Sequence, residues 1–461
     1  MTIRSVLIAN RGEIAVRIIR AAQALGIRTV QVYSAADADM LAVRLADEAI
    51  NIGSPAPKKS YLNGAAIVAA ARAAGVDAVH PGYGFLSENG DFADAVEAAG
   101  MIFIGPSGDA IRLLGDKVQA RAVAARAGVP TVPGSDGRIE DLAAARAVIA
   151  RTGFPVMIKA AAGGGGRGIR IAHSEAEFEQ QFPLATAEAL AAFGDGGLYL
   201  EKVVTRARHV EVQIFGDGDR VVHFFERECS LQRRRQKVWE EAPAARLPEA
   251  VRTRLCASAV ALAETVQYRG AGTVEFLYDE TTQDFYFIEV NTRIQVEHPV
   301  TEMITGFDLM QEMFRVAGGA PLSLRQDQIV RRGHAIECRI NAEDPSRDFM
   351  PAPGTVTRLR VPEGEGIRFD TMLYEGYTVP PFYDSLLGKL IVWAETREAC
   401  LDTLTTALQG LVIDGVPTTI PLHLALAGNA AVRASDVHTR FLETWLETDA
   451  ILHSDDRAEV A

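Results

Sequence analysis

Cysteine is scarce in this chain, and positive charge is in the minority. The four cysteines, Cys229, Cys256, Cys338 and Cys400, lie far apart among 461 residues, with no C-x-x-C pair and no histidine at zinc-ligand spacing. We therefore expect buried thiols in a reducing compartment. The 60 acidic side chains outnumber the 47 basic ones, which gives a net charge of −13 at pH 7. This charge repels phosphate backbones and anionic membrane surfaces, so neither nucleic acid nor a membrane is an expected partner.

Long apolar runs are missing as well. No stretch reaches the ~18 uninterrupted apolar residues of a membrane helix. The N-terminal segment enters a strand too early for a signal peptide and has no Arg/Ser-rich transit segment, so we expect a cytoplasmic protein. The remaining composition, 48% apolar and 23% charged, is that of a globular chain. Its length allows about three domains at roughly 100–200 residues each.

Strands and helices alternate over the first part of the chain. The apolar run 5–9 precedes helical spacing over 14–25, and a β-rich segment follows at 29–33. The alternation continues to the run 101–107. Such alternation predicts a doubly wound parallel sheet, which we assign to residues 1–114.

Beyond residue 115 the pattern changes. Gly/Pro turns and short strands from Gly333 onward predict a third, β-rich α+β domain that ends with helices. The expected domains are therefore 1–114, 115–332 and 333–461. Within the second domain we expect helices over 116–127, from about 175 and over 248–267, strands over 154–159, 169–171 and 198–229, and a hairpin over 271–291.

The run of glycines after the strand 154–159 is the first candidate binding element. Its spacing Gly163-x-Gly165-x-x-Gly168 fits the dinucleotide fingerprint, but that fingerprint leads into a helix, whereas a strand follows here. Ile169 stands where a Walker loop needs lysine, and the H-R-D and D-F-G motifs of a protein kinase are missing. What remains is a hairpin whose glycine tip closes its amides over phosphates, with Lys159 on the incoming strand. The alternative is a flexible surface loop.

Acidic side chains on the hairpin 271–291 form the second candidate site. Glu275 stands between apolar neighbours, and Glu289 and Asn291, two residues apart, share one strand face. Burying carboxylates there is costly without a counter-charge. Because Mg²⁺ takes one or two carboxylates together with water and phosphate oxygens, we predict a magnesium site. The alternative is an amphipathic hairpin with its acidic face in water.

The same alternation continues through Arg293, Gln295 and Glu297. A fully extended chain from Glu289 to Glu297 would span roughly 26 Å, too long for one reaction centre, so we expect a bend after Asn291. A metal-binding end and an anion-binding end would result.

A cationic cluster, Gln-Arg-Arg-Arg-Gln-Lys, occupies residues 232–237. A charge run is usually a solvated face, but this one follows a strand expected over 221–229 and also suits a small-anion site. His209 and Glu211 lie two apart on a strand, and they either point together toward a nucleotide or form a structural pair.

Longer motifs carry a family resemblance. They are 10–15 (NRGEIA), 80–89 (HPGYGFLSEN), 115–117 (GDK), the glycine hairpin, 236–237 (QK), 240–243 (EEAP), 289–299 (EVNTRIQVEHP), 337–345 (ECRINAEDP) and 383–385 (YDS). In this order, and over nearly the whole chain, the motifs resemble those of biotin carboxylase, an ATP-grasp ligase.

The resemblance implies an α/β ATP-grasp fold, with residues 115–332 as the ATP-grasp domain and about 130–204 as a glycine-hairpin lid. It also implies that ATP phosphorylates bicarbonate, that carboxyphosphate yields CO₂, and that the ureido nitrogen of biotin captures it. Carried over position by position, it implies ATP contacts by Lys117, Lys159, the backbone of Gly163, Gly164, Gly165, Gly166 and Gly168, Glu201, Lys202, His209 and Gln232. It implies Mg²⁺ or Mn²⁺ binding by Glu275, Glu289 and Asn291, a bicarbonate cradle of Lys237, Arg293, Gln295 and Val296, Glu297 as the general base, and Arg339 and Tyr83 at the biotin.

The chain departs from the family pattern at two positions. Arg235 stands where many relatives carry histidine, which leaves the ATP contact at that position open. Ala162 precedes four glycines where some relatives have a fifth, and four glycines suffice for the hairpin tip.

The partners follow from what the sequence omits. It ends at Ala461 without the Met-Lys-Met motif of a biotinyl domain and without length for a carboxyltransferase. We therefore expect biotin on a separate carrier protein or domain and a carboxyltransferase subunit, in a multi-subunit carboxylase such as acetyl-CoA carboxylase. Acetyl-CoA, another acyl-CoA and pyruvate stay open as acceptors, and the resemblance also implies a homodimer.

Two other functions compete with this one. Another ATP-grasp carboxylate–amine ligase would keep the metal face but has no reason to keep Arg293, Gln295 and Glu297 together. A non-catalytic ATP-binding scaffold of a carboxylase complex would have lost metal or base residues.

Overall fold

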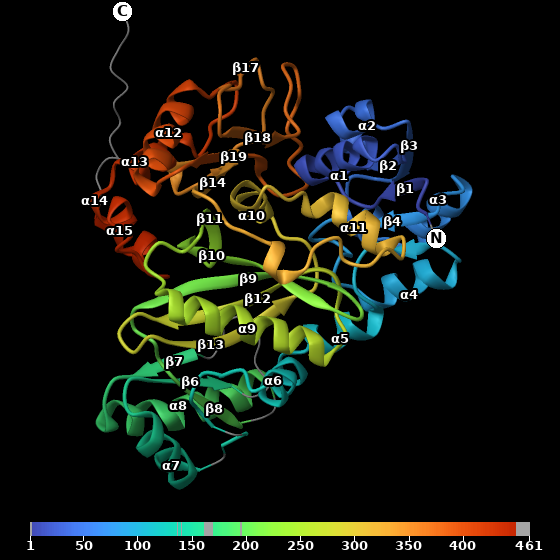
Figure 1. Cartoon of the computed structure of the whole chain (residues 1–461). Helices are drawn as coiled ribbons and strands as arrows, with labels where there is room; N and C mark the ends of the chain where they lie inside the picture. The colour runs from blue at the N-terminus through green and yellow to red at the C-terminus, as the bar shows by residue number, and fades with distance from the viewer. Residues whose placement is uncertain (1, 136, 140, 161–168, 194–195, 449–461) are drawn as a thin grey trace, which may run out of the picture.

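The computed structural model describes residues 2–135, 137–139, 141–160, 169–193 and 196–448. The glycine run 163–168, for which ATP contacts are expected, lies outside these residues. The described chain forms a parallel sheet at its N-terminus, a small sheet in the lid and one long antiparallel sheet from the remainder (Figure 1).

The N-terminal segment folds around a five-stranded sheet. Its strands run in the order β3-β2-β1-β4-β5 and every neighbouring pair is parallel, as the alternating pattern predicts. The order reverses between β1 and β4, so the loops after these strands meet at one edge. There Asn10 donates to the carbonyl oxygens of Pro81 and Tyr83, each at 2.7 Å. The elements are β1 (Ser5–Ile8), α1 (Gly12–Ala24), β2 (Arg28–Ser34), η1 (Ala35–Asp37), α2 (Leu41–Leu45), β3 (Glu48–Gly53), η2 (Pro57–Lys59), α3 (Gly64–Ala73), β4 (Ala78–His80), α4 (Gly90–Ala98), β5 (Ile102–Phe103) and α5 (Gly108–Gly115).

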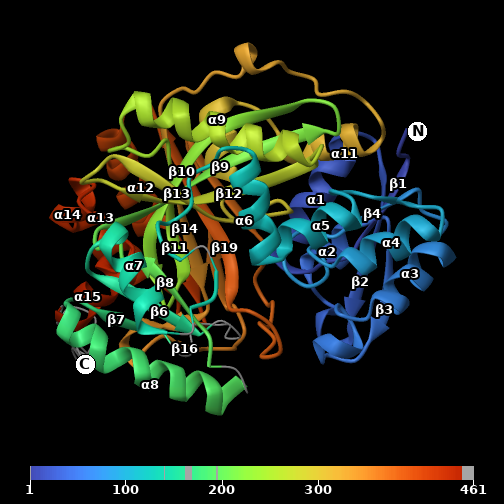
Figure 2. The ribbon, with the colours of Figure 1, turned by 90° about the horizontal axis from the view of Figure 1, so that it is seen from below.

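The lid has its own sheet and core. Its strands pair antiparallel in the order β7-β6-β8, and Phe178 and Phe182 of α8 are buried against them. Figure 1 shows the predicted lid at the bottom, below the long sheet, and the N-terminal segment at the upper right; in Figure 2 the two lie at the lower left and at the right. α6 (Lys117–Arg126) precedes the predicted lid, whose elements are α7 (Leu142–Thr152), β6 (Val156–Ala160), β7 (Ile169–Ala172), α8 (Glu175–Phe193) and β8 (Leu198–Lys202).

An eight-stranded antiparallel sheet joins the second and third segments, in the order β13-β12-β9-β10-β11-β14-β19-β18. β11 pairs with β14 so that Glu240 lies opposite Glu337, and the sheet therefore continues across residue 333. This pairing covers an edge of β11 that would otherwise expose unpaired backbone groups. Its strands are β9 (Ala207–Asp217), β10 (Val221–Arg233), β11 (Gln236–Ala242), β12 (Arg269–Asp279), β13 (Asp284–Asn291), β14 (His334–Asn341), β18 (Ile367–Thr371) and β19 (Leu386–Ala394).

Helices and short strands complete the described chain. Cys338 of β14 and Cys400 of α12 share one core, and all four cysteines are free and buried, as expected. No helix within the described ranges is both long and apolar enough to cross a membrane. The remaining elements are α9 (Glu249–Thr265), α10 (His298–Thr305), α11 (Leu309–Ala317), η3 (Gln326–Gln328), β15 (Glu343–Asp344), η4 (Pro345–Arg347), β16 (Met350–Pro351), β17 (Arg358–Arg360), α12 (Arg397–Gly410), β20 (Val412–Asp414), α13 (Ile420–Gly428), α14 (Ala430–Arg433) and α15 (Phe441–Thr448).

Candidate active site

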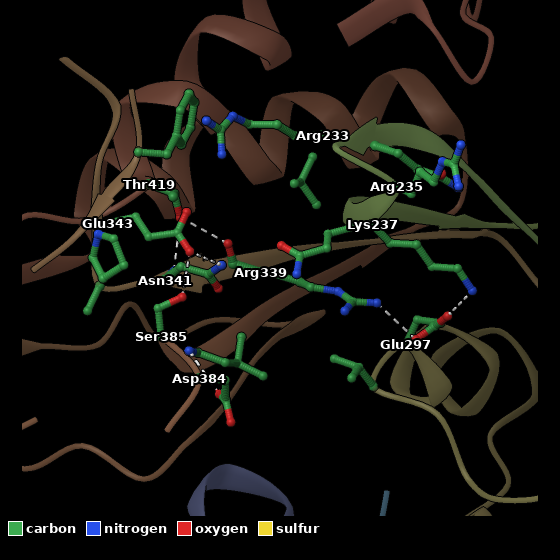
Figure 3. A pocket seen from close by; sticks show the side chains of 18 of the residues that line it. Arg233, Arg235, Lys237, Glu297, Arg339, Asn341, Glu343, Asp384, Ser385 and Thr419 are labelled. Atoms are coloured by element: carbon green, nitrogen blue, oxygen red, sulfur yellow. Dashed lines mark hydrogen bonds and ion pairs between the residues drawn. The ribbon is translucent and has the colours of Figure 1, made fainter. Parts of the chain in front are cut away.

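A cavity of about 690 Å³ lies where the three segments meet. Its lining includes Tyr83 from the N-terminal segment, Lys237 from β11, Glu297 from the bend after β13, and Arg339 from β14. Figure 3 shows the last three around one point of this cavity. The long sheet and the N-terminal loops therefore bring residues that are far apart in the sequence into one site.

One end of the cavity holds two facing carboxylates. Glu275 and Glu289 are directly opposite each other on β12 and β13, and Asn291 donates to Glu275 Oε1 at 2.9 Å. Burial raises the pKa of Glu289, and the charge of Glu275 adds to this shift. A divalent cation between the two carboxylates would relieve their repulsion, so these three residues fit the predicted magnesium site.

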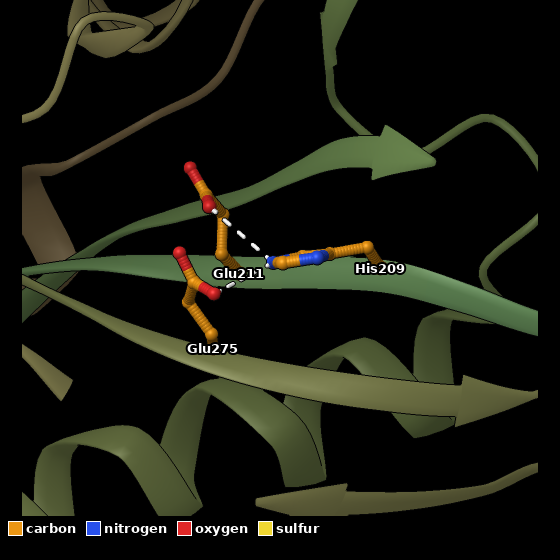
Figure 4. A group of neighbouring side chains, drawn as sticks. All are labelled: His209, Glu211 and Glu275. Carbon is orange, nitrogen blue, oxygen red and sulfur yellow. Dashed lines mark ion pairs between the residues drawn. The ribbon is translucent and has the colours of Figure 1, made fainter. Parts of the chain in front are cut away.

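His209, Glu211 and Glu275 form a second group on the same sheet (Figure 4). One ligand atom from each lies within 4.8 Å of the others, and His209 Nε2 is 3.0 Å from Glu275 Oε2. Glu211 is fully buried and already paired with Arg227 Nε at 2.6 Å and with Lys237. Because two cations neutralise Glu211, it suits a metal less well than Glu289; Glu275 belongs to both groups and also pairs with Lys237.

The chain bends where the sequence predicts it. β13 ends at Asn291 and α10 begins at His298, so residues 292–297 turn back over the sheet. Gln295 links the bend to the metal end, because its Nε2 donates to Glu275 Oε1 at 3.1 Å. Its Oε1 accepts from Arg227 at 3.0 Å. The polar edge therefore closes into one site instead of extending along a strand.

Glu297 lies between two cations, Lys237 and Arg339, in the lining of the cavity (Figure 3). Its Oε1 accepts from Lys237 Nζ at 2.7 Å, and its Oε2 from Arg339 Nη2 at 3.1 Å. Burial alone would raise the pKa of Glu297, but Lys237, Arg339 and Arg227 hold it far below its usual range. Conversely, burial would lower the pKa of Lys237, and the surrounding carboxylates raise it instead. Glu297 is therefore ionised, as a proton acceptor must be.

Three further hydrogen bonds hold the bend. Arg293 donates to Asn291 Oδ1 at 2.9 Å and to Glu88 Oε2 at 2.8 Å. The carbonyl oxygen of Val296 accepts from Lys389 Nζ at 2.8 Å. These bonds fix the backbone on both sides of Gln295.

Lys389 also reaches the N-terminal segment. This fully buried cation lies 3.3 Å from Glu13 Oε2 in α1, and Glu13 accepts a hydrogen bond from Tyr83. The predicted biotin contact, Tyr83, is therefore connected through Glu13 and Lys389 to the backbone next to Glu297.

The residues predicted to hold ATP fall into two groups. Gln232 and His209 line the cavity, with Gln232 Nε2 2.9 Å from His209 Nδ1. Lys159 pairs with Glu201 on the lid sheet, where Arg121 also donates to Glu201 at 3.0 Å. Lys117 at the start of α6 and Lys159, Glu201 and Lys202 in the lid are not part of the cavity lining that the described residues make.

Sequence reasoning assigned no role to several residues that hold this site together. Glu88, Glu13 and Glu240 lie inside motifs that carried the resemblance, yet their partners come from distant segments. Arg227 gave no such signal, since it stands between two other charged residues, Glu226 and Glu228, in β10. Its partner Glu211 lies directly opposite it on β9, and only the strand register reveals this.

Comparison with known families gives three matches that together cover most of the chain. Residues 2–111 match the model described as biotin carboxylase, N-terminal domain, and residues 337–444 match the biotin carboxylase C-terminal domain. Residues 116–325 match the ATP binding domain of the carbamoyl-phosphate synthase L chain.

Individual proteins agree with these matches. The biotin carboxylase of Pseudomonas aeruginosa is 51% identical over 449 residues, which are 97% of this chain and 99% of that protein. The biotin carboxylase domain of a thermophilic 2-oxoglutarate carboxylase bound to bicarbonate has a TM-score of 0.93 and 44% identity, and covers 98% of this chain and 99% of that one. The corresponding domain dimer from Hydrogenobacter thermophilus, in complex with MgADP, ADP and bicarbonate, has a TM-score of 0.87 and 46% identity, with both chains fully covered. By these matches in sequence and structure, the chain belongs to the biotin carboxylase family.

Proposed function

We propose that this protein is the biotin carboxylase component of a biotin-dependent carboxylase. It uses ATP and bicarbonate to carboxylate biotin carried on a separate protein or domain, by way of carboxyphosphate. The observation that carries the proposal is Glu297 held between Lys237 and Arg339 beside the facing carboxylates Glu275 and Glu289. Such a site places a base, Glu297, and the cations that would bind bicarbonate next to carboxylates that would bind a metal ion.

The phosphoryl-transfer end is assigned to Glu275, Glu289 and Asn291. Phosphoryl transfer depends mainly on positioning and charge neutralisation, and a bound Mg²⁺ or Mn²⁺ would supply the latter. We assign the nucleotide to His209 and Gln232 on the central sheet and to Lys117, Lys159, Glu201, Lys202 and the glycines 163–168. The MgADP complex of the Hydrogenobacter thermophilus domain supports this assignment.

The bicarbonate end is assigned to Lys237, Arg293, Gln295 and Val296. The cations attract the anion, and Glu297 accepts its proton so that the oxygen can attack the γ-phosphorus and release ADP. The C–O bond to the bridging oxygen of the resulting carboxyphosphate then breaks, which releases phosphate and yields CO₂ for biotin. Lys237 is suited to this place because it contacts both Glu275 at the metal end and Glu297 at the base end.

The biotin end is assigned to Arg339 and Tyr83. A ureido nitrogen is a poor nucleophile until it is deprotonated, and a guanidinium at the ureido oxygen stabilises the charge that develops there. Arg339 lines the cavity and keeps its charge at all physiological pH values. It therefore serves as the oxyanion donor of the second half-reaction.

The assembly is part of the same proposal. We assign a biotin carrier protein or domain and a carboxyltransferase as partners, a cytoplasmic location, and a homodimer, which the dimeric Hydrogenobacter thermophilus domain supports. We also keep the division into 1–114, 115–332 and 333–461, although the long sheet spans the second boundary.

One assay tests the function. ATP hydrolysis by the purified chain is measured with Mg²⁺ alone, with added bicarbonate, and with bicarbonate and free biotin. We expect turnover to need Mg²⁺ and bicarbonate and to rise with biotin. Turnover that ignores biotin but responds to an amino acid would instead support a carboxylate–amine ligase, and no turnover would support a scaffold.

A further inference from the structure

We propose that Glu240 is a positioning residue of the biotin half-reaction, which competes with the base Glu297 for Arg339 and so holds the guanidinium toward biotin. The inference rests on the proposed function, because it uses the roles given there to Arg339 and Glu297. Arg339 Nε lies 2.6 Å from Glu240 Oε1, and its Nη2 lies 3.1 Å from Glu297 Oε2. The two carboxylates thus share one cation.

The surroundings of Glu240 point to function and not to packing alone. Its side chain is 0% exposed, yet its Oε2 has no hydrogen-bond partner among the described residues. A buried carboxylate oxygen left unsatisfied is costly, so its retention needs an explanation. The next residue provides a contrast: Glu241 accepts from Arg397 at 2.7 Å and lies 2.9 Å from His334. The carboxylate of Glu241 therefore has structural hydrogen-bond partners, whereas Oε2 of Glu240 has none among the described residues.

A second buried acid lies directly opposite Glu240. Glu337 is also 0% exposed, and neither of its oxygens has a hydrogen-bond partner among the described residues. Burial raises the pKa of Glu337 well above its usual range, although Lys389 opposes the shift, and the charge of Glu240 adds to it. The interior therefore favours the neutral form of Glu337.

Glu240 is the member of the pair that contacts Arg339. Burial raises its pKa to about 7, against the effect of Arg339 and with that of Glu297. The titratable and charged groups that face it come from every neighbouring element: Arg339, Glu337 and Cys338 on β14, Lys237 on β11, Cys229 on β10, Glu297 in the bend and, behind Glu337, Lys389 on β19.

This arrangement gives the site two states. While Glu240 is ionised, it holds Arg339 Nε and balances the attraction of Glu297. When Glu240 is protonated, Arg339 pairs with Glu297 alone, which lowers the basicity of Glu297 and turns the guanidinium from biotin. Biotin-dependent turnover should therefore fall as the pH falls through the titration of Glu240.

The test compares kcat for biotin-dependent ATP turnover, between about pH 6 and 9, in the parent and in Glu240→Gln, Glu240→Asp and Glu241→Gln, with the ATP dissociation constant measured for each. We expect Glu240→Gln to lower kcat by about 10-fold or more at alkaline pH. The decrease of kcat toward acidic pH, called the acid limb below, should be absent in this variant. Its ATP affinity should stay within about 2-fold of the parent. Glu240→Asp keeps the charge and should restore the limb with an intermediate kcat. Glu241→Gln, the matched control, should keep both kcat and the limb.

Several results would overturn the inference. One is a Glu240→Gln variant whose kcat and acid limb both match those of the parent. Another is a Glu240→Gln variant whose kcat is lower but whose acid limb is unchanged. If Glu240→Gln does not fold, the aspartate variant decides, because a parent-like kcat there also contradicts the inference. A parent without biotin-dependent turnover overturns the proposed function and this inference together, whereas an active parent with unresponsive variants overturns the inference alone.

Discussion

Arg227 and Glu211 form a fully buried ion pair, with the Nε of the arginine 2.6 Å from Oε1 of the glutamate. The two residues lie opposite each other on β10 and β9, beneath the site. Arg227 also donates to Gln295 and to Thr273, so one buried cation fixes both a sheet strand and the bend that carries Glu297, the proposed base.

Replacing Arg227 should therefore lower the free energy of unfolding. Arg227→Met leaves Glu211 with one cation fewer in the interior, and breaking a buried pair costs about 3–5 kcal/mol of unfolding free energy. Arg112 also contacts carboxylates, but its side chain is 44% exposed. Arg112→Met should cost much less, because water screens ion pairs at the surface. Urea denaturation of both variants measures the difference, and equal losses would show that burial does not govern this pair.

Glu297→Gln tests the base. A positioned general base contributes about 10²–10⁴-fold, so biotin-dependent turnover should fall by that order. ATP affinity should stay within a few-fold, since Glu297 contacts Lys237 and Arg339 and not the predicted nucleotide residues. Turnover and the nucleotide dissociation constant are measured together. Turnover close to that of the parent would make Glu297 a structural partner of the two cations.

Glu289→Gln tests the metal end. Because Glu289 faces Glu275 across the hairpin, losing its charge should weaken metal–nucleotide binding and turnover together. The exposed Asp284 on the same strand gives a control, Asp284→Asn, which should change neither. Titration with Mg²⁺ at fixed ATP measures the effect. An unchanged magnesium dependence in Glu289→Gln would assign the acidic pair to structure.

Arg235 and Lys237 should differ sharply although both are cationic residues of one cluster. Arg235 is exposed at the turn between β10 and β11, whereas Lys237 contacts Glu275 and Glu297. Arg235→His should keep substantial activity and Lys237→Gln should lose it. Steady-state kinetics of the two folded variants decide, and comparable losses would reverse this ranking.

The buried His80 should give the protein a measurable pH dependence. Burial lowers its pKa from 6.5 to about 3, so the unfolded chain binds a proton that the folded chain does not. The free energy of unfolding therefore falls as the pH drops below about 6.5, by up to about 1.4 kcal/mol per pH unit from this residue. Denaturation near pH 7 and pH 5 should show a smaller slope in His80→Gln than in the parent. His173→Gln, at an exposed position, is the control and should keep the slope of the parent. If His80→Gln and His173→Gln show the same dependence of unfolding free energy on pH, the assignment to His80 is wrong.

Local patterns in the sequence predicted much of this molecule. Alternating strands and helices predicted the parallel N-terminal sheet, and the period of two placed Glu289 and Asn291 on one face. The bend after Asn291 followed from the length of an extended chain.

Pairing between distant strands was beyond such reasoning. The joining of β11 to β14 depends on which edges are free after folding, and no periodicity records that. Glu240 and Glu337 were therefore missed as a pair, since each looks like an ordinary strand glutamate until the other is placed opposite it. Arg227 was missed for the same reason, because its role depends on Glu211 one strand away.

The salt bridge from Lys389 to Glu13 has a consequence for how this protein can be divided. A fragment that begins at residue 115 would keep the buried Lys389 and its bond to Val296 but lose the Glu13 carboxylate. The N-terminal segment thus supplies the negative charge that pairs with Lys389 next to the bend 292–297. Grafting a foreign segment 1–114 onto this chain would preserve the site only if the graft brought a carboxylate to the same position in α1.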